Sequence, residues 1–264
     1  MIKITVIPNR EKDPELIYTG QVKKRLLSLG CEVAVDDMNA ADYVIVIGGD
    51  GSILRAARQT APLGIPLLCI NLGRLGYMTE LEIDELPLID ELVYGNYTIE
   101  ERMMLSVEIL HGENAAGLMT ALNDAVVSNG AVSRMIDVDL YCGGSRVGRY
   151  RADGLICATP TGSTAYSLSA GGPVIDPQVG CICVTPVSPH SLRAKPLIFS
   201  DMSVLEIRDN LNSQGDVYVT VDGSENHRLV SGDTVRITKS EMTTRLIRLK
   251  KNRFYDVLYK KMSE

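Results

Sequence analysis

The sequence lacks the charge balance and the apolar segments that mark nucleic-acid-binding and membrane proteins. Its 264 residues include 27 Lys or Arg and 33 Asp or Glu, and the net charge of −6 gives no support for a general nucleic-acid-binding surface. No stretch approaches the ~18 apolar residues that are needed to span a bilayer. The chain starts in a strand-like run without the layout of a signal peptide. We therefore expect a cytoplasmic protein that binds neither nucleic acid nor a membrane.

Cysteine and histidine are too few and too scattered for the usual metal and catalytic sites. The six cysteines form no Cys-x-x-Cys pair and no cluster spaced with histidine, so we expect buried, reduced thiols and no structural zinc or disulfide framework. None of the three histidines has an obvious partner, which gives little support to histidine-based catalysis. The sequence contains no dedicated set of metal ligands.

Several sequence motifs of well-known enzyme classes are also missing. There is no Gly-x-x-x-x-Gly-Lys-Ser/Thr, which excludes a P-loop enzyme. Gly49-Asp50-Gly51 is not followed by the third glycine of a dinucleotide fingerprint. The chain has neither a Gly-x-Ser-x-Gly elbow nor a His-Glu-x-x-His sequence.

What the chain does contain is a glycine-rich turn with one acid, at residues 48–52. The apolar run Tyr43 to Ile47 has strand character and stops at Gly48-Gly49, and a helix-like segment follows Ser52. The glycines allow a sharp turn whose N–H groups are exposed at close range, and the start of a helix favours phosphate. A loop that only held phosphate would gain nothing from a carboxylate, so we expect Asp50 to do chemistry or hold a metal ion.

The hydrophobic pattern changes near residue 98. Over residues 1–98, apolar strand-like runs alternate with helical segments, among them residues 84–94, and this indicates a mostly parallel sheet covered on both faces. Such sheets bind ligands beyond the carboxyl ends of their strands, where the Gly-rich turns at 48–51 and 71–77 lie. Over residues 99–249, period-two runs such as Val217–Val221 indicate an antiparallel β-rich domain.

Smaller features of the second half give further expectations. Asn226-His227 is typical of a turn, and residues 234–238 with 244–249 are predicted to form a hairpin. Residues 254–262 return to helical spacing, so we expect the segment 250–264 to pack back on the first domain and complete it.

Two polar stretches of the second half are candidates for ligand binding. Asn123-Asp124 could grip a ribose or an adenine amino group, although such a dipeptide also occurs in turns and bulges. Residues 159–169 carry seven Ser, Thr or Tyr hydroxyls at a strand-to-helix turn, which suits polar ligands and phosphates. A turn that only caps a helix would explain the same residues.

Taken in order, these blocks resemble the bacterial NAD kinase family over roughly residues 43–224. The resemblance is carried by Gly48-Gly49-Asp50-Gly51-Ser52, Asn71-Leu72-Gly73 with Leu75-Gly76-Tyr77, Leu122-Asn123-Asp124, Arg151-Ala152-Asp153-Gly154-Leu155, residues 158–173, Thr185-Pro186 with Pro189-His190-Ser191-Leu192, and Val221-Asp222-Gly223. The long block at 158–173 is highly specific, whereas Gly-Gly-Asp-Gly alone also occurs in phosphofructokinases and in lipid kinases of the diacylglycerol and sphingosine type.

The resemblance implies a Rossmann-like α/β domain and a β-sandwich-like, antiparallel C-terminal domain. It also implies transfer of a terminal phosphoryl group to the 2′-hydroxyl of the adenosine ribose of NAD, giving NADP, with Asp50 as the general base. The NAD contacts that it implies are Asp50, Gly51, Tyr77, Asn123, Asp124, Arg134, Arg151, Asp153, Thr161, Thr164, Ala165, Tyr166, Ser169 and Ser224, and the phosphate loop is Gly48, Gly49, Gly51 and Ser52.

The sequence departs from relatives at two of these positions. Many relatives have Glu in place of Asp124, which shortens the side chain here by one methylene, and relatives often carry a longer polar residue in place of Ser224. The donor, ATP or polyphosphate, is left open, and so are NADH acceptance and feedback by NADP. The family implies Mg²⁺ or Mn²⁺ with the donor phosphates, and a homodimer or homotetramer.

Two rival functions stay open at the level of sequence. The first is another Gly-Gly-Asp-Gly kinase that acts on a lipid or a sugar, but this class does not predict the block at 159–173. The second is a non-catalytic NAD-binding sensor, in which loss of Asp50 would be expected, whereas Asp50 is present.

Overall fold

The computed structural model describes residues 1–112, 114–130, 135–209, 216–251 and 253–263, and the chain forms two compact units. Unit 1 comprises Met1–Glu101 and Met242–Glu264, and unit 2 comprises Arg102–Glu241. Two long strands, β6 (Thr98–His111) and β17 (Asp233–Arg248), contribute residues to both units. The expected domain boundaries at 98/99 and 249/250 stay a prediction.

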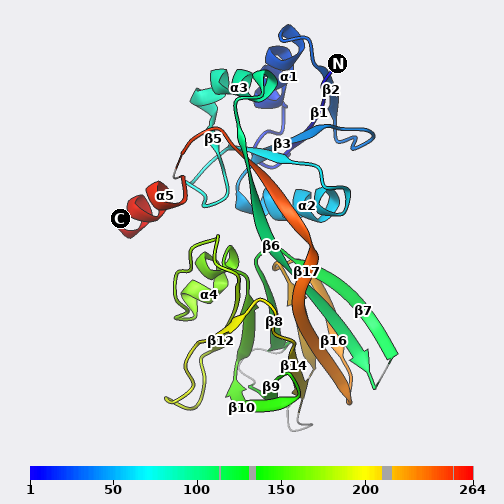
Figure 1. The fold of residues 1–264 in the computed structure, drawn as a ribbon, viewed down its shortest axis with the longest axis vertical. Helices are drawn as coiled ribbons and strands as arrows, with labels where there is room; N and C mark the ends of the chain where they lie inside the picture. The colour runs from blue at the N-terminus through cyan, green and yellow to red at the C-terminus, as the bar shows by residue number, and fades with distance from the viewer. Residues whose placement is uncertain (113, 131–134, 210–215, 252, 264) are drawn as a thin grey trace. The chain divides into compact units, whose positions relative to one another are not determined.

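Unit 1 is built on a parallel sheet (Figure 1). Its strands follow the order β2 (Glu32–Val35), β1 (Lys3–Pro8), β3 (Tyr43–Gly48) and β4 (Leu67–Asn71), and β5 (Leu81–Glu82) and the end of β17 also pair with β4. The helices between the strands are α1 (Ile17–Ser28), α2 (Asp50–Thr60) and α3 (Ile89–Tyr94), with 3-10 helices at Ala61–Leu63 and Ile83–Leu88. Continuous apolar strands fit this arrangement because both faces of a parallel sheet are covered.

The parallel sheet determines where the loops of unit 1 meet. In the register of the sheet, Ile47 pairs with both Pro8 and Ile70, so β1, β3 and β4 end at the same edge. The core beneath that edge consists of fully buried aliphatic side chains, chiefly Ile4, Val6, Val22, Leu26, Ile45, Ile47, Leu68, Ile70, Leu81, Ile89 and Leu92. The turns after the three strands are therefore brought together on a rigid base.

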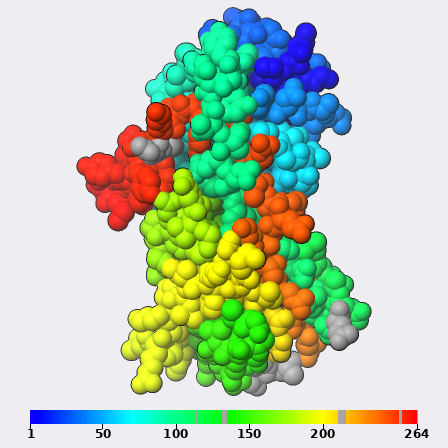
Figure 2. All heavy atoms as spheres, viewed as in Figure 1, coloured from blue at the N-terminus to red at the C-terminus, as the bar shows by residue number. Residues whose placement is uncertain are grey.

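The end of the chain belongs to unit 1. Helix α5 (Arg253–Met262) buries Val257 completely, and the Phe254 ring lies 6.0 Å from the ring of Tyr77. The space-filling view shows the red end of the chain against the teal residues of unit 1 (Figure 2). This confirms the expected helix that packs back on the first domain.

Unit 2 consists almost entirely of antiparallel strands. One sheet has the order β13 (Leu197–Ser200), β12 (Cys181–Val187), β11 (Gly154–Ala158), β8 (Asp124–Asn129), β15 (Val217–Val221) and β16 (Glu225–Leu229). The other strands are β7 (Asn114–Ala121), β9 (Ile136–Cys142), β10 (Ser145–Ala152) and β14 (Leu205–Asp209), which pair with one another or with β6 and β17. The 3-10 helix Gly162–Thr164 and the short helix α4 (Tyr166–Ser169) follow β11. The expected fold class, an α/β domain followed by an antiparallel β-rich domain, is confirmed.

Three sequence-based expectations were wrong in detail. Residues 234–249 form no hairpin, because β17 runs unbroken over 16 residues and Lys-Ser-Glu-Met-Thr at 239–243 contains no Gly, Pro, Asn or Asp. Asn226-His227 lies inside β16, since the turn is made earlier by Asp222 and Gly223, both with positive φ. Residues 83–94 form a 3-10 helix that contains Pro87, followed by the short α3, in place of one helix.

No helix among the described residues has the length and apolar character needed to cross a membrane.

Candidate functional site

The glycine-rich turn connects β3 directly to α2. Gly48 ends the strand, Gly49 precedes the helix in an extended conformation, and Asp50 is the first residue of α2. A Cβ on Gly48 would lie 2.8 Å from the Cβ of Ser52, so only glycine lets this side chain fold back against the strand end. The helix therefore starts three residues earlier than the sequence predicted, and Asp50 lies at its positive end.

The Asp50 carboxylate is held in place by the neighbouring loop. It accepts hydrogen bonds from the backbone N–H of Tyr77 at 3.0 Å and from that of Met78 at 3.2 Å. A Cβ on Gly76 would lie 2.9 Å from Asp50 Cγ, so the backbone approaches the carboxylate as closely as glycine allows. Asp50 is half-buried, and two N–H donors determine its orientation.

Tyr77 lies beside this carboxylate and against the C-terminal helix. Lys261 Nζ lies 5.0 Å from the centre of the Tyr77 ring, a cation–π distance. Burial, together with the charge of Asp50, raises the pKa of the Tyr77 phenol. The ring is thus a neutral, partly covered apolar surface near the Gly-rich turn.

In unit 2, Asp222 organises the turn that carries Asn123 and Asp124. Its carboxylate accepts the N–H groups of Leu122 at 3.0 Å, Asn123 at 2.8 Å and Asp124 at 3.2 Å. Asp222 has φ +47, a strained value for a residue with a side chain, and the three hydrogen bonds explain why it is tolerated. Burial and the nearby Asp222 raise the pKa of Asp124 to about 7.

The hydroxyl-rich turn after β11 is locked to the same backbone. Thr159 Oγ1 donates to the Leu122 carbonyl at 2.6 Å and accepts the Gly162 N–H at 3.0 Å. A Cβ on Gly162 would lie 2.7 Å from the Asn123 Cα and closer still to its carbonyl. The structure therefore brings the two polar stretches of unit 2 together.

The hydroxyls of this turn divide into two sets. Ser163 and Ser167 are fully buried and make hydrogen bonds within the protein. The Ser163 hydroxyl accepts the Ile175 N–H, and the Ser167 hydroxyl is hydrogen-bonded to the hydroxyl of Thr185. Thr164 and Ala165 are half-buried, and Tyr166 and Ser169 are exposed. The expected NAD contacts of this segment, apart from the buried Thr161, are thus the residues that solvent can reach. Thr161 accepts a hydrogen bond from the buried Arg102 at 3.2 Å.

The remaining residues of unit 2 that were expected to contact NAD lie at the surface or outside the described residues. Arg151 and Asp153 have exposed side chains at the end of β10 and just after it, and Ser224 is exposed in the turn before β16. Arg134 lies outside the described residues.

Sequence reasoning missed three residues that shape these sites. Asp222 belongs to one of the motifs of the family, but the sequence analysis gives it no role. Asp in a turn often accepts hydrogen bonds from nearby backbone N–H groups, and this could have indicated its role. Gly76 was also noted without its contact to Asp50. Lys12 was missed entirely: its Nζ lies near Gly49 and Gly73, and no local pattern indicates this.

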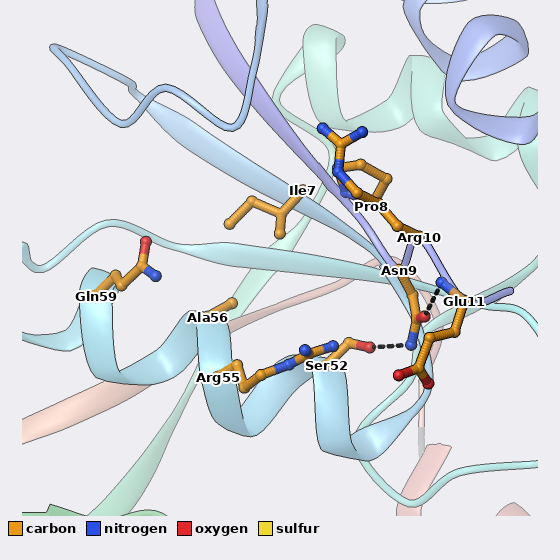
Figure 3. Close-up of a pocket in the computed structure, with 9 residues that line it drawn as sticks. All are labelled: Ile7, Pro8, Asn9, Arg10, Glu11, Ser52, Arg55, Ala56 and Gln59. Atoms are coloured by element: carbon orange, nitrogen blue, oxygen red, sulfur yellow. Dashed lines mark hydrogen bonds between the residues drawn. The ribbon is translucent and has the colours of Figure 1, made fainter. Parts of the chain in front are cut away.

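A cavity of about 350 Å³ lies next to the Gly-rich turn (Figure 3). It is lined by Ile7, Pro8, Asn9, Arg10, Glu11, Ser52, Arg55, Ala56 and Gln59. Within it, Asn9 Nδ2 donates to Ser52 Oγ at 3.0 Å, which ties the end of β1 to the start of α2. The described residues contain no group of three His, Cys, Asp or Glu side chains that could hold a metal ion.

Both halves of the chain match described protein families. Residues 9–97 match the ATP-NAD kinase N-terminal domain, and residues 122–249 match the ATP-NAD kinase C-terminal domain. An NAD kinase of Symbiobacterium thermophilum is 48% identical over 283 residues, which cover 100% of this chain and 99% of that protein. An NAD kinase of Moorella thermoacetica is 46% identical over 246 residues, which cover 91% of this chain and 78% of the relative.

Solved structures show the same fold. An NAD kinase from Archaeoglobus fulgidus in complex with ATP superposes with a TM-score of 0.82 at 27% identity, with full coverage of both chains. A yeast NADH kinase complexed with NADH gives a TM-score of 0.85 at 22% identity and covers 100% of this chain and 88% of that one.

Proposed function

This chain belongs to the NAD kinase family, and we propose that Asp50 is the general base with which it phosphorylates NAD. The enzyme transfers a phosphoryl group from ATP to NAD and forms NADP. The observation that carries the proposal for Asp50 is its placement at the first turn of α2, between two glycines and under two N–H donors.

The chemistry required of Asp50 follows from the acceptor. The 2′-hydroxyl of a ribose is a poor nucleophile at neutral pH, and a carboxylate within hydrogen-bond reach can take its proton as attack proceeds. The hydroxyl oxygen forms a bond to the terminal phosphorus, the bond from phosphorus to the bridging oxygen breaks, and the electron pair stays on the leaving diphosphate. The Tyr77 and Met78 N–H groups occupy part of the carboxylate and leave its other lone pairs for the proton.

The phosphates of the donor are assigned to the loop Gly48, Gly49, Gly51 and Ser52. Asp50 and Gly51 are the first two residues of α2, so their N–H groups have no acceptor within the helix. Such groups, with the helix dipole behind them, bind anions.

The binding of NAD is assigned to residues of unit 2 in addition to Asp50, Gly51 and Tyr77. Asn123 offers an amide on a turn that Asp222 fixes, and Asp124 beside it is poised between its two protonation states near neutral pH. The other proposed contacts are Arg134, Arg151, Asp153, Thr161, Thr164, Ala165, Tyr166, Ser169 and Ser224.

A divalent cation, Mg²⁺ or Mn²⁺, would come with the donor. We assign this ion mainly to the phosphate oxygens of the donor, which are its usual ligands beside a nucleotide. When bound, such an ion neutralises charge on the phosphates. Polyphosphate as an alternative donor belongs to the same proposal.

Location and assembly complete the proposal. The six free thiols fit the reducing cytoplasm, and a homodimer or homotetramer is the expected assembly. Light scattering on the purified protein measures its mass and decides between a monomer and these two states.

The experiment that tests the function is a panel of acceptors incubated with ATP and Mg²⁺. We expect NADP to form from NAD and no phosphorylated product to form from lipids or sugars. Formation of a lipid or sugar phosphate with no NADP would overturn the proposal, and NAD binding without turnover would point to a sensor.

A further inference from the structure

Lys12 places a cation above both glycine-rich turns of unit 1. It follows β1 at the edge of the sheet where β3 and β4 also end. A Cβ on Gly73 would lie 2.8 Å from Lys12 Nζ, and one on Gly49 would lie 3.5 Å from it. The ammonium group therefore lies close to the backbone of the two turns, at a place that a side chain on residue 73 would have to share with it.

The backbone of Lys12 is fixed relative to the Gly-rich loop. The carbonyl of Asn9 accepts the N–H of Lys12 at 3.0 Å and that of Asp13 at 2.8 Å. The side chain of the same Asn9 accepts the Glu11 N–H at 3.1 Å and donates to Ser52 Oγ, as Figure 3 shows. The turn that carries Lys12 is thus bound to the residue two positions after Asp50.

The charge of Lys12 is not neutralised within the described part of the chain, where no carboxylate lies within 4.0 Å of its Nζ. The neighbouring start of α2 also carries positive dipole character. A cation above unsatisfied N–H groups favours an anion, and phosphate oxygens are the usual ligands of a lysine placed in this way.

A buried polar atom gives independent support for a ligand at this place. Asn71, 2% exposed, lines the same cavity of about 550 Å³ as Lys12 and Gly73. Its Nδ2 donates to the carbonyls of Gly73 and Arg74 and to Glu82, while its Oδ1 has no hydrogen-bond partner among the described residues. A buried acceptor without a partner is costly. A phosphate oxygen cannot donate to it, but a water or a divalent cation that comes with a phosphate ligand would satisfy it.

We propose that Lys12 Nζ, with the backbones of the Gly49 and Gly73 turns, binds the terminal phosphates of the phosphoryl donor. The inference rests on the proposed function, because it takes the donor to be a chain of phosphates. Glu82 and Asp84 also line the cavity and would repel a bare polyanion, so the site suits a donor whose charge is partly neutralised by a divalent cation. In the reaction the ammonium group stabilises the charge that builds up on the leaving phosphate oxygens.

The test compares Lys12→Ala, Lys12→Gln and Lys12→Arg with Lys23→Ala, which removes the same charge from an exposed position on α1. Steady-state rates are measured against ATP at saturating NAD and against NAD at saturating ATP. Binding of inorganic tripolyphosphate with Mg²⁺ is measured by calorimetry on the same proteins.

We expect Lys12→Ala and Lys12→Gln to lower kcat/KM for ATP by ~10²-fold, because the loss of one hydrogen-bond donor to the charge of a transition state has an effect of this size. The Kd of NAD should be unchanged. Tripolyphosphate binding should be lost in both variants, partly retained in Lys12→Arg and unchanged in Lys23→Ala.

Unchanged tripolyphosphate binding in Lys12→Ala, or absence of binding to the unaltered protein, would overturn the proposal. A Kd of NAD raised by as much as kcat/KM for ATP is lowered would do the same. If the unaltered protein makes no NADP, the proposed function fails, but calorimetry still decides the role of Lys12. Melting curves of both Ala variants verify that each is folded, and Lys12→Gln replaces Lys12→Ala if it is not.

Discussion

At the scale of single residues, two aspartates have opposite environments. Asp50 is half-buried and receives two backbone N–H groups, which hold its carboxylate in one orientation. Asp124 is 5% exposed and lies beside Asp222, which disfavours its charge. The first environment orients a carboxylate that is proposed to accept a proton, and the second suits a group that exchanges a proton near neutral pH.

Replacing Asp50 with Asn should abolish most turnover without loss of NAD binding. Asn keeps the shape and an acceptor for the Tyr77 N–H but cannot take a proton, so we expect kcat to fall by ~10²-fold or more. NADP formation is followed by a coupled assay and NAD affinity by calorimetry. The surface variant Asp37→Asn is the control, and near-normal turnover of Asp50→Asn would rule out the base role.

Asp124 should make the protein less stable as the pH rises from about 4 to about 7. Its pKa is about 7 in the folded state against 3.8 as a free side chain, so over this range the native state holds a proton that the unfolded state has lost. Asp124→Asn should therefore raise the melting temperature at pH 8 and leave it nearly unchanged at pH 4. Melting curves at both pH values, with Asp37→Asn for comparison, check this. An equal shift at the two values would contradict the pKa assignment.

At the scale of elements, the junctions between strands and the helices or turns that follow them are closely packed. The end of β3 packs against Ser52, and the turn after β11 packs against the backbone before β8. These junctions place the functional groups, and glycine is required where one backbone touches another.

Gly162→Ala should destabilise unit 2 and displace Asn123. The new methyl group would overlap the Asn123 backbone, which cannot move away as a flexible side chain could, so we expect a loss of ~1–3 kcal/mol in the free energy of unfolding. A weaker NAD affinity should accompany it. Urea titration measures the first effect. Gly20→Ala, in α1 with nothing within 4 Å of the added Cβ, is the control and should gain ~0.5–1 kcal/mol.

A buried ion network joins the end of β17 to the loop behind Asp50. Arg248, 7% exposed, donates to the Met78 carbonyl at 3.2 Å and to Glu80 at 3.0 Å, and Glu80 is fully buried. Glu80 also accepts the N–H groups of Leu249 and Lys250, which fixes the start of the C-terminal segment.

Arg248→Met should therefore be strongly destabilising. It leaves Glu80 with less compensation for its buried charge, and we expect a loss of ~3–5 kcal/mol in the free energy of unfolding. The exposed pair of Arg10 and Asp36 is the matched control, where Arg10→Met should cost less than ~1 kcal/mol. Equal losses in the two variants would show that the network does not support unit 1.

At the scale of the whole molecule, one chain combines two different architectures. A parallel α/β sheet carries the proposed base and the proposed phosphate loop, and an antiparallel unit carries most of the proposed NAD contacts. The chain passes between them through β6 and β17 and returns to unit 1 for its last helix.

NAD should stabilise the folded chain by an amount that grows with the logarithm of its free concentration above Kd. At a free concentration of 100 times Kd, a ligand that binds only the folded state adds ~2.7 kcal/mol, which melting curves at increasing NAD will detect. Nicotinamide mononucleotide, which lacks the adenosine ribose, is the control and should produce a smaller shift at the same concentration. An equal shift would argue against the proposed contacts to that ribose.

The sequence by itself determined the class of fold, the position of the Gly-rich turn and the acid within it. Apolar periodicity and glycine placement are local properties, so β3 and α5 could be predicted within about two residues. The same local reasoning failed for β17, because it cannot show that a strand continues without a turn from one unit into the other.

Only the tertiary structure decided which distant residues meet. Asp222 reaches the turn at 122–124 from about 100 positions away in the chain, Arg248 reaches Glu80, and Lys12 lies over Gly73. These pairings depend on strand order and register, which bring together the ends of strands that are far apart in sequence. The sequence therefore supplies the carboxylate proposed as the base, and the fold supplies the backbone N–H groups that orient it.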